Sequence, residues 1–179
     1  MFSQINSVFT CSAADSFFIW ITDLNKNRYF AYIAIPLVFF FFFKKYKRPG
    51  ITFFIFLVLA LSVNDFAGAQ VKNYIERPRP EQSDSLIVQH RTSAGGYSFY
   101  SNHASNMFTF ATYMSYFFPA ARIPLFILAA TVAYSRVYVG VHFPTDVLAG
   151  IIMGLFLGFL FSKLVSRFSE WNAARKNSQ

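Results

Sequence analysis

The sequence predicts an all-α integral membrane protein: a helical bundle of five transmembrane helices, with a sixth span as the alternative, preceded by an N-terminal interfacial helix. Composition is the first reason. Of the 179 residues, 55% are hydrophobic and only 13% are charged, whereas charged residues make up about 25% of an average soluble domain. The 25 Phe residues are more than a soluble core of this length could bury, so much of the apolar surface is expected to face lipid.

The arrangement of the apolar residues is the second reason. They form five blocks separated by charged or turn-forming residues: Tyr29–Phe43, Ile51–Val71, Ala104–Phe118, Ile123–Val139 and Val147–Phe161. A spanning helix needs about 20 residues, so the shorter blocks must extend into their polar flanks. The run Phe39–Phe43 is expected to face lipid, and the tail from Glu170 to Gln179 is expected to be solvated.

A shorter apolar segment, Ala13–Thr22, precedes these blocks. Ten residues of helix are too short to cross a bilayer, and Trp20 is typical of the headgroup region. We therefore expect an interfacial helix here. A strongly tilted sixth span, merged with its neighbours, is the alternative.

Basic residues near the blocks indicate the orientation in the membrane. They form three groups: Lys44, Lys45, Lys47 and Arg48; Arg122; and Lys163, Arg167, Arg175 and Lys176. Five spans place these groups on one side, which we assign to the cytoplasmic face of a bacterial inner membrane. The opposite, periplasmic side then holds the N-terminus and residues 72–103 and 136–142. That side is also basic, which the charge rule does not explain.

The polar residues of the outer side come from three separated segments. They are Lys72, Arg79, Ser101, His103, Arg136, His142 and Asp146. Charged residues at membrane boundaries are costly unless they are used or paired, and Arg suits phosphate because it donates two parallel hydrogen bonds. Three converging cations therefore indicate a dianionic ligand. Nucleic acid is not expected as a partner, because the chain has no long Lys/Arg run or basic helical stripe.

His142 and Asp146 are four residues apart at the start of the last expected helix, so they can share one face. A carboxylate that accepts a hydrogen bond from one imidazole nitrogen leaves the other nitrogen unprotonated and more basic. That arrangement suits a nucleophile. His103 lies on a different segment and could act as a general acid for a leaving oxygen.

These residues carry a family resemblance. The chain resembles the type 2 phosphatidic acid phosphatase superfamily of lipid phosphatases, whose motifs are Lys-x6-Arg-Pro, Pro-Ser-Gly-His and Ser-Arg-x5-His-x3-Asp. The first motif is matched at full spacing over Lys72–Pro80, and the third over Ser135–Asp146. The middle motif is Tyr100–His103, in which Ser and His match while Tyr and Asn replace Pro and Gly. The resemblance covers about residues 65–150 of a single membrane-embedded domain expected over residues 1–179.

The resemblance implies a role for each matched residue. His142 would attack phosphorus and form a phosphohistidine, Asp146 would orient it, and His103 would protonate the departing alkoxide. The phosphoryl oxygens would be bound by the other matched residues: Lys72, Arg79, Arg136, Ser101 and the backbone of Asn102. Members of the family need no metal, so neither a metal nor another cofactor is expected.

The expected substrate is a lipid phosphate, because the site lies at the membrane surface among membrane lipids. Lipid A 1-phosphate is slightly favoured, since a compact chain leaves the site open to a large headgroup. Phosphatidylglycerol phosphate and undecaprenyl pyrophosphate are the alternatives. A transporter for an anionic lipid or phosphate is the alternative of another class, although its charges would be spread along several spans. The hydropathy disfavours the related vanadate-binding haloperoxidases, which are soluble.

Several polar residues near the motifs match none of them. Arg77 and Glu76 are expected to pair within their loop or to contact headgroups. His90 and Arg91 in the outer loop are weaker candidates for substrate contact. Asp65 lies two helical turns before Lys72, and we expect it to steady either a basic residue of the site or a neighbouring helix.

Overall fold

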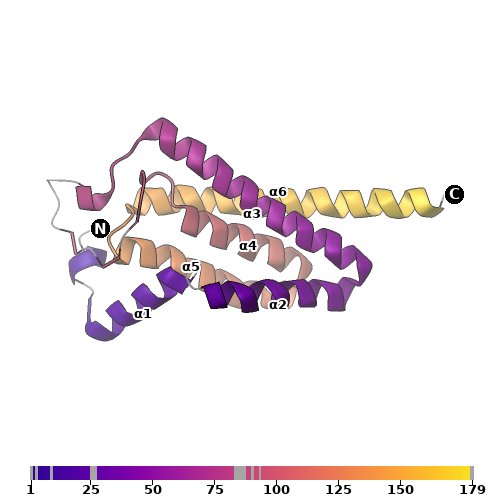
Figure 1. Ribbon diagram of the computed structural model, residues 1–179, viewed down its shortest axis with the longest axis horizontal. Coiled ribbons are helices and arrows are strands. Elements are labelled where there is room, and N and C mark those ends of the chain that lie inside the picture. The colour runs from indigo at the N-terminus through magenta and orange to yellow at the C-terminus, as the bar shows by residue number, and fades with distance from the viewer. Residues whose placement is uncertain are drawn as a thin grey trace.

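The last and longest helix of the chain lies along the long axis of the molecule, and the other helices lie beside it, some of them at oblique angles (Figure 1). The computed structural model describes residues 2, 4–8, 10–24, 28–82, 88–89, 91–92 and 94–177. Its α-helices are α1 (Ser12–Asp23), α2 (Arg28–Tyr46), α3 (Arg48–Ile75), α4 (Asn102–Phe117), α5 (Arg122–Tyr138) and α6 (Pro144–Asn177). Short helical turns cover Gln4–Val8, Pro80–Gln82 and Pro119–Ala121. The described residues contain no strand, and the all-α prediction is confirmed.

The five apolar blocks correspond to α2 through α6, with boundaries that mostly differ by a few residues. The exception is α6, which continues to Asn177, so the tail expected to be solvated is helical as far as this residue, and its side chains from Glu170 to Arg175 are mostly exposed. Three described segments are long and apolar enough to cross a membrane: Arg48–Gln82, Pro119–Tyr138 and Pro144–Arg175. They contain α3, α5 and α6, and the spanning of α2 and α4 stays a prediction.

Helix α4 is the centre of the bundle and packs against α3, α5 and α6. Its contact with α6 is close because Gly150, Gly154 and Gly158 recur every four residues on the facing side of α6. A Cβ atom at Gly154 would lie only 2.4 Å from the carbonyl oxygen of Ser105. Small residues at this spacing let helix backbones approach each other in membranes. The close packing holds the beginning of α6 beside the beginning of α4.

An aromatic cluster fills the end of the bundle where α2 turns into α3. The rings of Phe53 and Phe117 stack with centroids 4.6 Å apart, and the Tyr113 hydroxyl donates to the Phe53 carbonyl at 2.7 Å. Phe42 is fully buried in this cluster, so the expectation that all of Phe39–Phe43 faces lipid is wrong for this ring. The helical period turns one side chain of the run inward, and the other four remain exposed.

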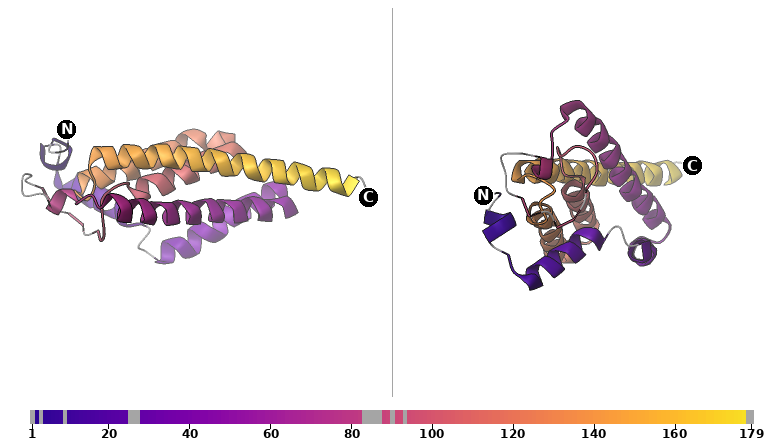
Figure 2. Two further views of the ribbon diagram at one scale, coloured as in Figure 1. Left: turned by 90° about the horizontal axis from the view of Figure 1, so that it is seen from above. Right: turned by 60° about the vertical axis from the view of Figure 1, so that its left-hand side comes forward.

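Helix α1 lies beside α5 at the end of the molecule that carries the N-terminus (Figures 1 and 2). The ring of Phe18 packs against that of Tyr138 with centroids 4.5 Å apart, whereas Trp20 is 59% exposed. Twelve residues of helix span only about 18 Å, too little for the hydrocarbon core. The geometry favours the interfacial helix over the sixth span.

Arg91 links α1 to the end of α5. Its guanidinium donates to the Asp15 carboxylate at 2.7 Å and to the Tyr138 carbonyl at 3.1 Å, and it lies over the Tyr138 ring. These contacts give Arg91 a structural role, and its weaker candidacy for substrate contact stays untested. His90 lies outside the described residues.

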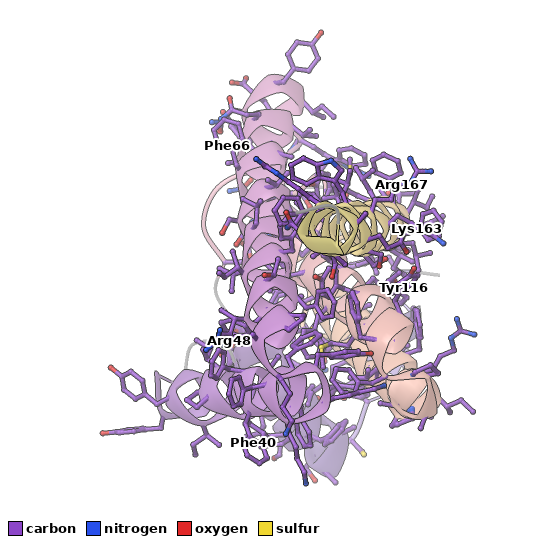
Figure 3. All side chains as sticks on the ribbon, turned by 90° about the vertical axis from the view of Figure 1, so that its right-hand side faces the viewer. Phe40, Arg48, Phe66, Tyr116, Lys163 and Arg167 are labelled. Carbon is purple, nitrogen blue, oxygen red and sulfur yellow. The ribbon has the colours of Figure 1, made fainter. Side chains whose placement is uncertain are left out.

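The opposite end of the bundle carries the expected cytoplasmic basic residues. Figure 3 looks onto that end and shows Arg48 at the start of α3, with Lys163 and Arg167 projecting from α6. The Lys163 ammonium lies 5.2 Å from the centre of the Tyr116 ring. The bundle thus separates these cations from the motif residues, which lie at the other end.

Candidate active site

Four helix ends meet at the end of the bundle that holds the motif residues. Lys72 lies in the last turn of α3 and Arg136 in the last turn of α5, while α4 and α6 begin there with Asn102 and Pro144. The amide of Ser101 donates to the carbonyl of Asp146 at 3.1 Å, which joins the starts of α4 and α6 directly. Residues from all three motifs are therefore brought together by the antiparallel order of the helices.

A tight turn between α5 and α6 presents His142. Gly140 has a φ of +85°, which only glycine adopts readily. The amide of His142 donates a hydrogen bond to the carbonyl of Arg136 at 3.3 Å. Helix α6 then begins with Pro144, a favoured first residue. The carboxylate of Asp146 accepts from the amide of Phe143 at 2.9 Å, which satisfies a backbone donor at the helix start. This hydrogen bond positions Asp146 independently of His142.

A serine from the loop before α4 bridges His142 and Asp146. The Nδ1 atom of His142 lies 3.7 Å from Oδ2 of Asp146, which is too long for a direct hydrogen bond. The hydroxyl of Ser98 donates to Oδ2 at 2.5 Å, and its oxygen lies 3.4 Å from Nδ1. All three side chains are buried. Ser98 can therefore accept from Nδ1–H while it donates to the carboxylate.

The second carboxylate oxygen of Asp146 is paired with Arg77. The guanidinium of Arg77 donates to Oδ1 at 2.6 Å and to the Thr145 hydroxyl at 2.8 Å, and it stacks on the Phe143 ring at 4.3 Å. Arg77 therefore pairs with Asp146 rather than with Glu76, and contact with headgroups stays a prediction. A buried carboxylate is costly without a cation and hydrogen bonds, and Arg77 supplies both.

The environment of His142 keeps its imidazole neutral. Burial lowers the pKa of His142 to about 4 and is the largest cause, the Asp146 carboxylate opposes it, and the positive charges of Arg136, Arg79 and Lys72 add to the lowering. With Nδ1 directed at Ser98 and Asp146, the lone pair is left on Nε2. That atom lies 3.4 Å from a guanidinium nitrogen of Arg79. His142 thus presents an unprotonated nitrogen toward the cations.

Lys72 and Arg79 hold the loop that precedes α4. The Lys72 ammonium donates to the Tyr100 carbonyl at 2.6 Å and more weakly to the carbonyls of Tyr97 and Ser98. Arg79 donates to the carbonyls of Gly95, Gly96 and Val141 at 2.7 to 2.9 Å. The oxygens of a bound phosphate would compete with these carbonyls for the same N–H groups.

Arg136 is the most deeply placed cation, with 3% of its surface exposed. Its guanidinium donates to the Thr22 hydroxyl of α1. Its Nε atom is buried and has no hydrogen-bond partner among the described residues. An unpaired buried N–H is costly, and an anion bound beside His142 would satisfy it.

The middle motif forms the start of α4. Ser101 is buried and acts as the N-cap, its hydroxyl lying 3.5 Å from the amide of Ala104. The side chain of Asn102 packs against Gly68 of α3, and its Nδ2 lies 3.4 Å from the Asp65 carboxylate. His103 faces a pocket of about 400 Å³ that is also lined by Asp65, Asn102 and Thr22.

Ser98 and Thr22 are site residues that the sequence patterns did not single out, and Arg77 was recognised only as a loop residue. Arg77 is one of the variable positions between Lys72 and Arg79, Ser98 lies just before the middle motif, and Thr22 comes from the interfacial helix. Their only sequence signal is proximity to a motif or to a charged residue. Asp65 was recognised, and of its two expected roles the structure shows the second, because Asn106 of α4 donates to it at 2.8 Å.

Comparison with known proteins adds independent information. The model of the PAP2 superfamily matches residues 51–170. A lipid A 4'-phosphatase of Porphyromonas gingivalis is 31% identical over 152 residues, which are 79% of this chain and 64% of the relative. The chain thus spans slightly less than two thirds of that relative's length.

Two crystal structures share the fold. LpxE of Aquifex aeolicus superposes with a TM-score of 0.73 at 28% identity, over 90% of this chain and 92% of its own. The transmembrane PAP2-type phosphatidylglycerolphosphate phosphatase of Bacillus subtilis also gives 0.73, at 26% identity, over 94% of this chain and 83% of its own. The similarity therefore covers nearly the whole chain, including the helices outside the motifs.

Proposed function

The chain belongs to the PAP2 superfamily, and on that basis we propose that it is a membrane enzyme that hydrolyses a lipid phosphate through a phosphohistidine on His142. The observation that carries the proposal is the buried imidazole of His142, whose Nε2 lies 3.4 Å from a guanidinium nitrogen of Arg79 and which also experiences the charges of Arg136 and Lys72. One of these cations has a buried N–H without a partner in the described part of the chain. This arrangement suits an incoming phosphate dianion and an attacking nitrogen.

In the first step, Nε2 of His142 attacks phosphorus and the bond to the leaving oxygen breaks. The attack makes the imidazole positive, and Asp146 stabilises that charge through Ser98 and Nδ1–H. His103 gives a proton to the leaving oxygen. Lys72, Arg79 and Arg136 stabilise the charge on the phosphoryl oxygens, with the Ser101 hydroxyl and the Asn102 amide at the start of α4 as further donors.

In the second step, water attacks the phosphohistidine and His103 accepts its proton. Phosphate monoester hydrolysis is among the slowest uncatalysed reactions, and a covalent intermediate divides it into two easier steps. The same cations act in both. Within the described residues no three His, Cys, Asp or Glu side chains cluster as metal ligands, and metal independence stays part of the proposal.

The substrate is a lipid because the site lies at one end of a bundle of membrane helices. With the basic end of Figure 3 in the cytoplasm, the site faces the periplasm of a bacterial inner membrane. Lipid A is the leading substrate, supported by the similarity to a lipid A 4'-phosphatase. The experiment below determines whether the expected 1-phosphate or the 4'-phosphate of lipid A is removed.

The decisive experiment compares wild type with His142→Ala in detergent. Each would be incubated with lipid A carrying a single phosphate at the 1- or 4'-position, and with phosphatidylglycerol phosphate, and phosphate release measured. We expect wild-type turnover, with lipid A fastest, and a loss of at least a thousandfold in the variant. Ser162→Ala, which removes a buried hydroxyl from α6 far from the site, is the control. Equal rates for wild type and His142→Ala would refute the proposal.

Two further measurements examine the mechanism and the alternative. A base-stable, acid-labile phosphoenzyme should form on wild type during turnover and be missing from His142→Ala. Liposomes that contain His142→Ala should show no phosphate-dependent flux. A flux that survives this substitution would favour the transporter instead.

A further inference from the structure

The pocket beside His103 is lined by two unlike sets of residues. Most of the residues from α3 and α4 are polar, namely Asp65, Asn102, His103 and Asn106, and most of those from α1 and α5 are aliphatic. Its volume is about 400 Å³, enough for the first part of a lipid tail and its linker. His103 is also the residue expected to protonate the leaving oxygen. The leaving half of the substrate is therefore the natural occupant of this pocket.

Asp65 gives this pocket a negative charge. It lies seven residues before Lys72 on α3, which is about 10 Å deeper along the helix. Its Oδ1 accepts from the side-chain amides of Asn106 and Asn102 at 2.8 and 3.4 Å. An ionised carboxylate can accept about four hydrogen bonds, so it can take more from a ligand. Ionisable residues inside membrane helices are costly and usually functional.

From this arrangement we propose that Asp65 makes the pocket selective for a neutral leaving alcohol, so that the enzyme acts on lipid phosphomonoesters in preference to pyrophosphates. The inference rests on the function proposed above. In a monoester, the P–O bond breaks, the electron pair stays on the leaving oxygen, and the proton from His103 yields a neutral alcohol. In a pyrophosphate, the same step leaves a lipid phosphate with at least one negative charge.

Charge repulsion then separates the two substrate classes. An anionic leaving phosphate would lie in the pocket that His103 and Asp65 both line, where the carboxylate of Asp65 would repel it. Asp65 is itself exposed, so the repulsion is moderate. A neutral alcohol has no such penalty, and a hydroxyl or amide N–H next to it could donate to the carboxylate. Phosphates of glycerol or sugar lipids fit this chemistry, whereas polyprenyl pyrophosphates do not.

The test uses two substrates with the same tail, farnesyl phosphate and farnesyl pyrophosphate, and the full-length protein in detergent. Wild type is expected to have the higher kcat/KM for the monophosphate. Asp65→Asn keeps an oxygen acceptor for Asn106 but removes the charge. It should raise kcat/KM for the pyrophosphate about tenfold, equal to ~1.4 kcal/mol, while the monophosphate value changes less than threefold.

One further variant tests the charge in the pocket without disturbing the hydrogen bonds between α3 and α4, and another serves as a control. Leu24→Lys places a cation on the lining of the pocket and should shift selectivity in the same direction. Glu170→Gln removes one negative charge at an exposed position near the far end of α6 and should leave selectivity unchanged. If Asp65→Asn unfolds at a much lower temperature than wild type, the Leu24→Lys result decides.

The outcomes separate this inference from the proposed function. A wild type that prefers the pyrophosphate, or an unchanged ratio in both pocket variants, would overturn the role of Asp65 while leaving the phosphatase intact. Failure of wild type to exceed His142→Ala on any phosphate substrate would instead refute the phosphatase itself.

Discussion

Replacing Ser98 with alanine tests whether the hydroxyl between His142 and Asp146 contributes to catalysis. The substitution removes the donor to Asp146 at 2.5 Å and the oxygen 3.4 Å from Nδ1. It leaves the Ser98 carbonyl that Lys72 contacts. Because His142 and Asp146 are 3.7 Å apart, no direct bond replaces the lost bridge unless the imidazole moves.

The expected magnitude follows from the strength of a hydrogen bond to a charged group, about 1.5–3 kcal/mol. If the entire loss appears in the transition state, kcat falls by roughly 10- to 150-fold, since 1.36 kcal/mol corresponds to tenfold. Arg77 and the Phe143 amide still hold Asp146, so the lower part of this range is expected. KM should change little, because the Ser98 hydroxyl is directed at Asp146 and Nδ1 rather than at the cations.

The assay is steady-state phosphate release from the best lipid substrate, with thermal unfolding measured on the same samples. Ser162→Ala is the matched control, because Ser162 is equally buried but bonds only within α6; its kcat should stay within twofold of wild type. A Ser98→Ala enzyme with wild-type kcat would show that Ser98 is only a packing residue. A rise in KM with unchanged kcat would place its role in binding instead.

Three more predictions follow from the structure. The acid limb of kcat/KM that belongs to the enzyme should lie near pH 4 and not near 6.5, because attack needs neutral imidazole and burial lowers the pKa of His142 to about 4; a limb near 6.5 that does not move with the pKa of the substrate phosphate would contradict this. Gly154→Val should destabilise the protein by about 1–3 kcal/mol in thermal unfolding, since its Cβ would lie 2.4 Å from the Ser105 carbonyl, while Gly95→Ala, with nothing within 4 Å, should not. Vanadate should inhibit and EDTA should not; loss of activity in EDTA that a divalent ion restores would contradict the metal-free mechanism.

Much of the fold could be predicted from the distribution of apolar residues. A membrane helix must satisfy its own backbone hydrogen bonds and face lipid with apolar side chains, so the blocks that became α2 to α6 are visible in the chain itself. The buried ring of Phe42 could not be predicted, because its burial depends on neighbouring helices rather than on hydropathy. The length of α6 could not be predicted either, because its last turns are polar, project beyond the bundle (Figure 1) and are mostly exposed.

The candidate site, too, could be predicted from the sequence only in part. His142 and Asp146 were predictable because four residues separate them in the sequence, although His142 lies in the turn before α6 rather than in the helix. Arg79 and Arg136 were predictable because each lies at a fixed distance within a motif. Ser98 and Arg77 belong to irregular segments without periodicity. Their contacts with Asp146 cross 48 and 69 residues of chain, a separation that no local pattern encodes.

The sequence by itself determined the class of protein, the order of its helices and which charged residues gather outside the apolar blocks, because hydropathy and spacing are properties of the chain alone. Only the tertiary structure decided how those residues are used. It placed Ser98 between His142 and Asp146, paired Arg77 with Asp146 and turned Asp65 toward the pocket beside His103. These contacts exist because four helix ends and one loop converge, and the glycine contacts of α6 with α4 set how closely they do so.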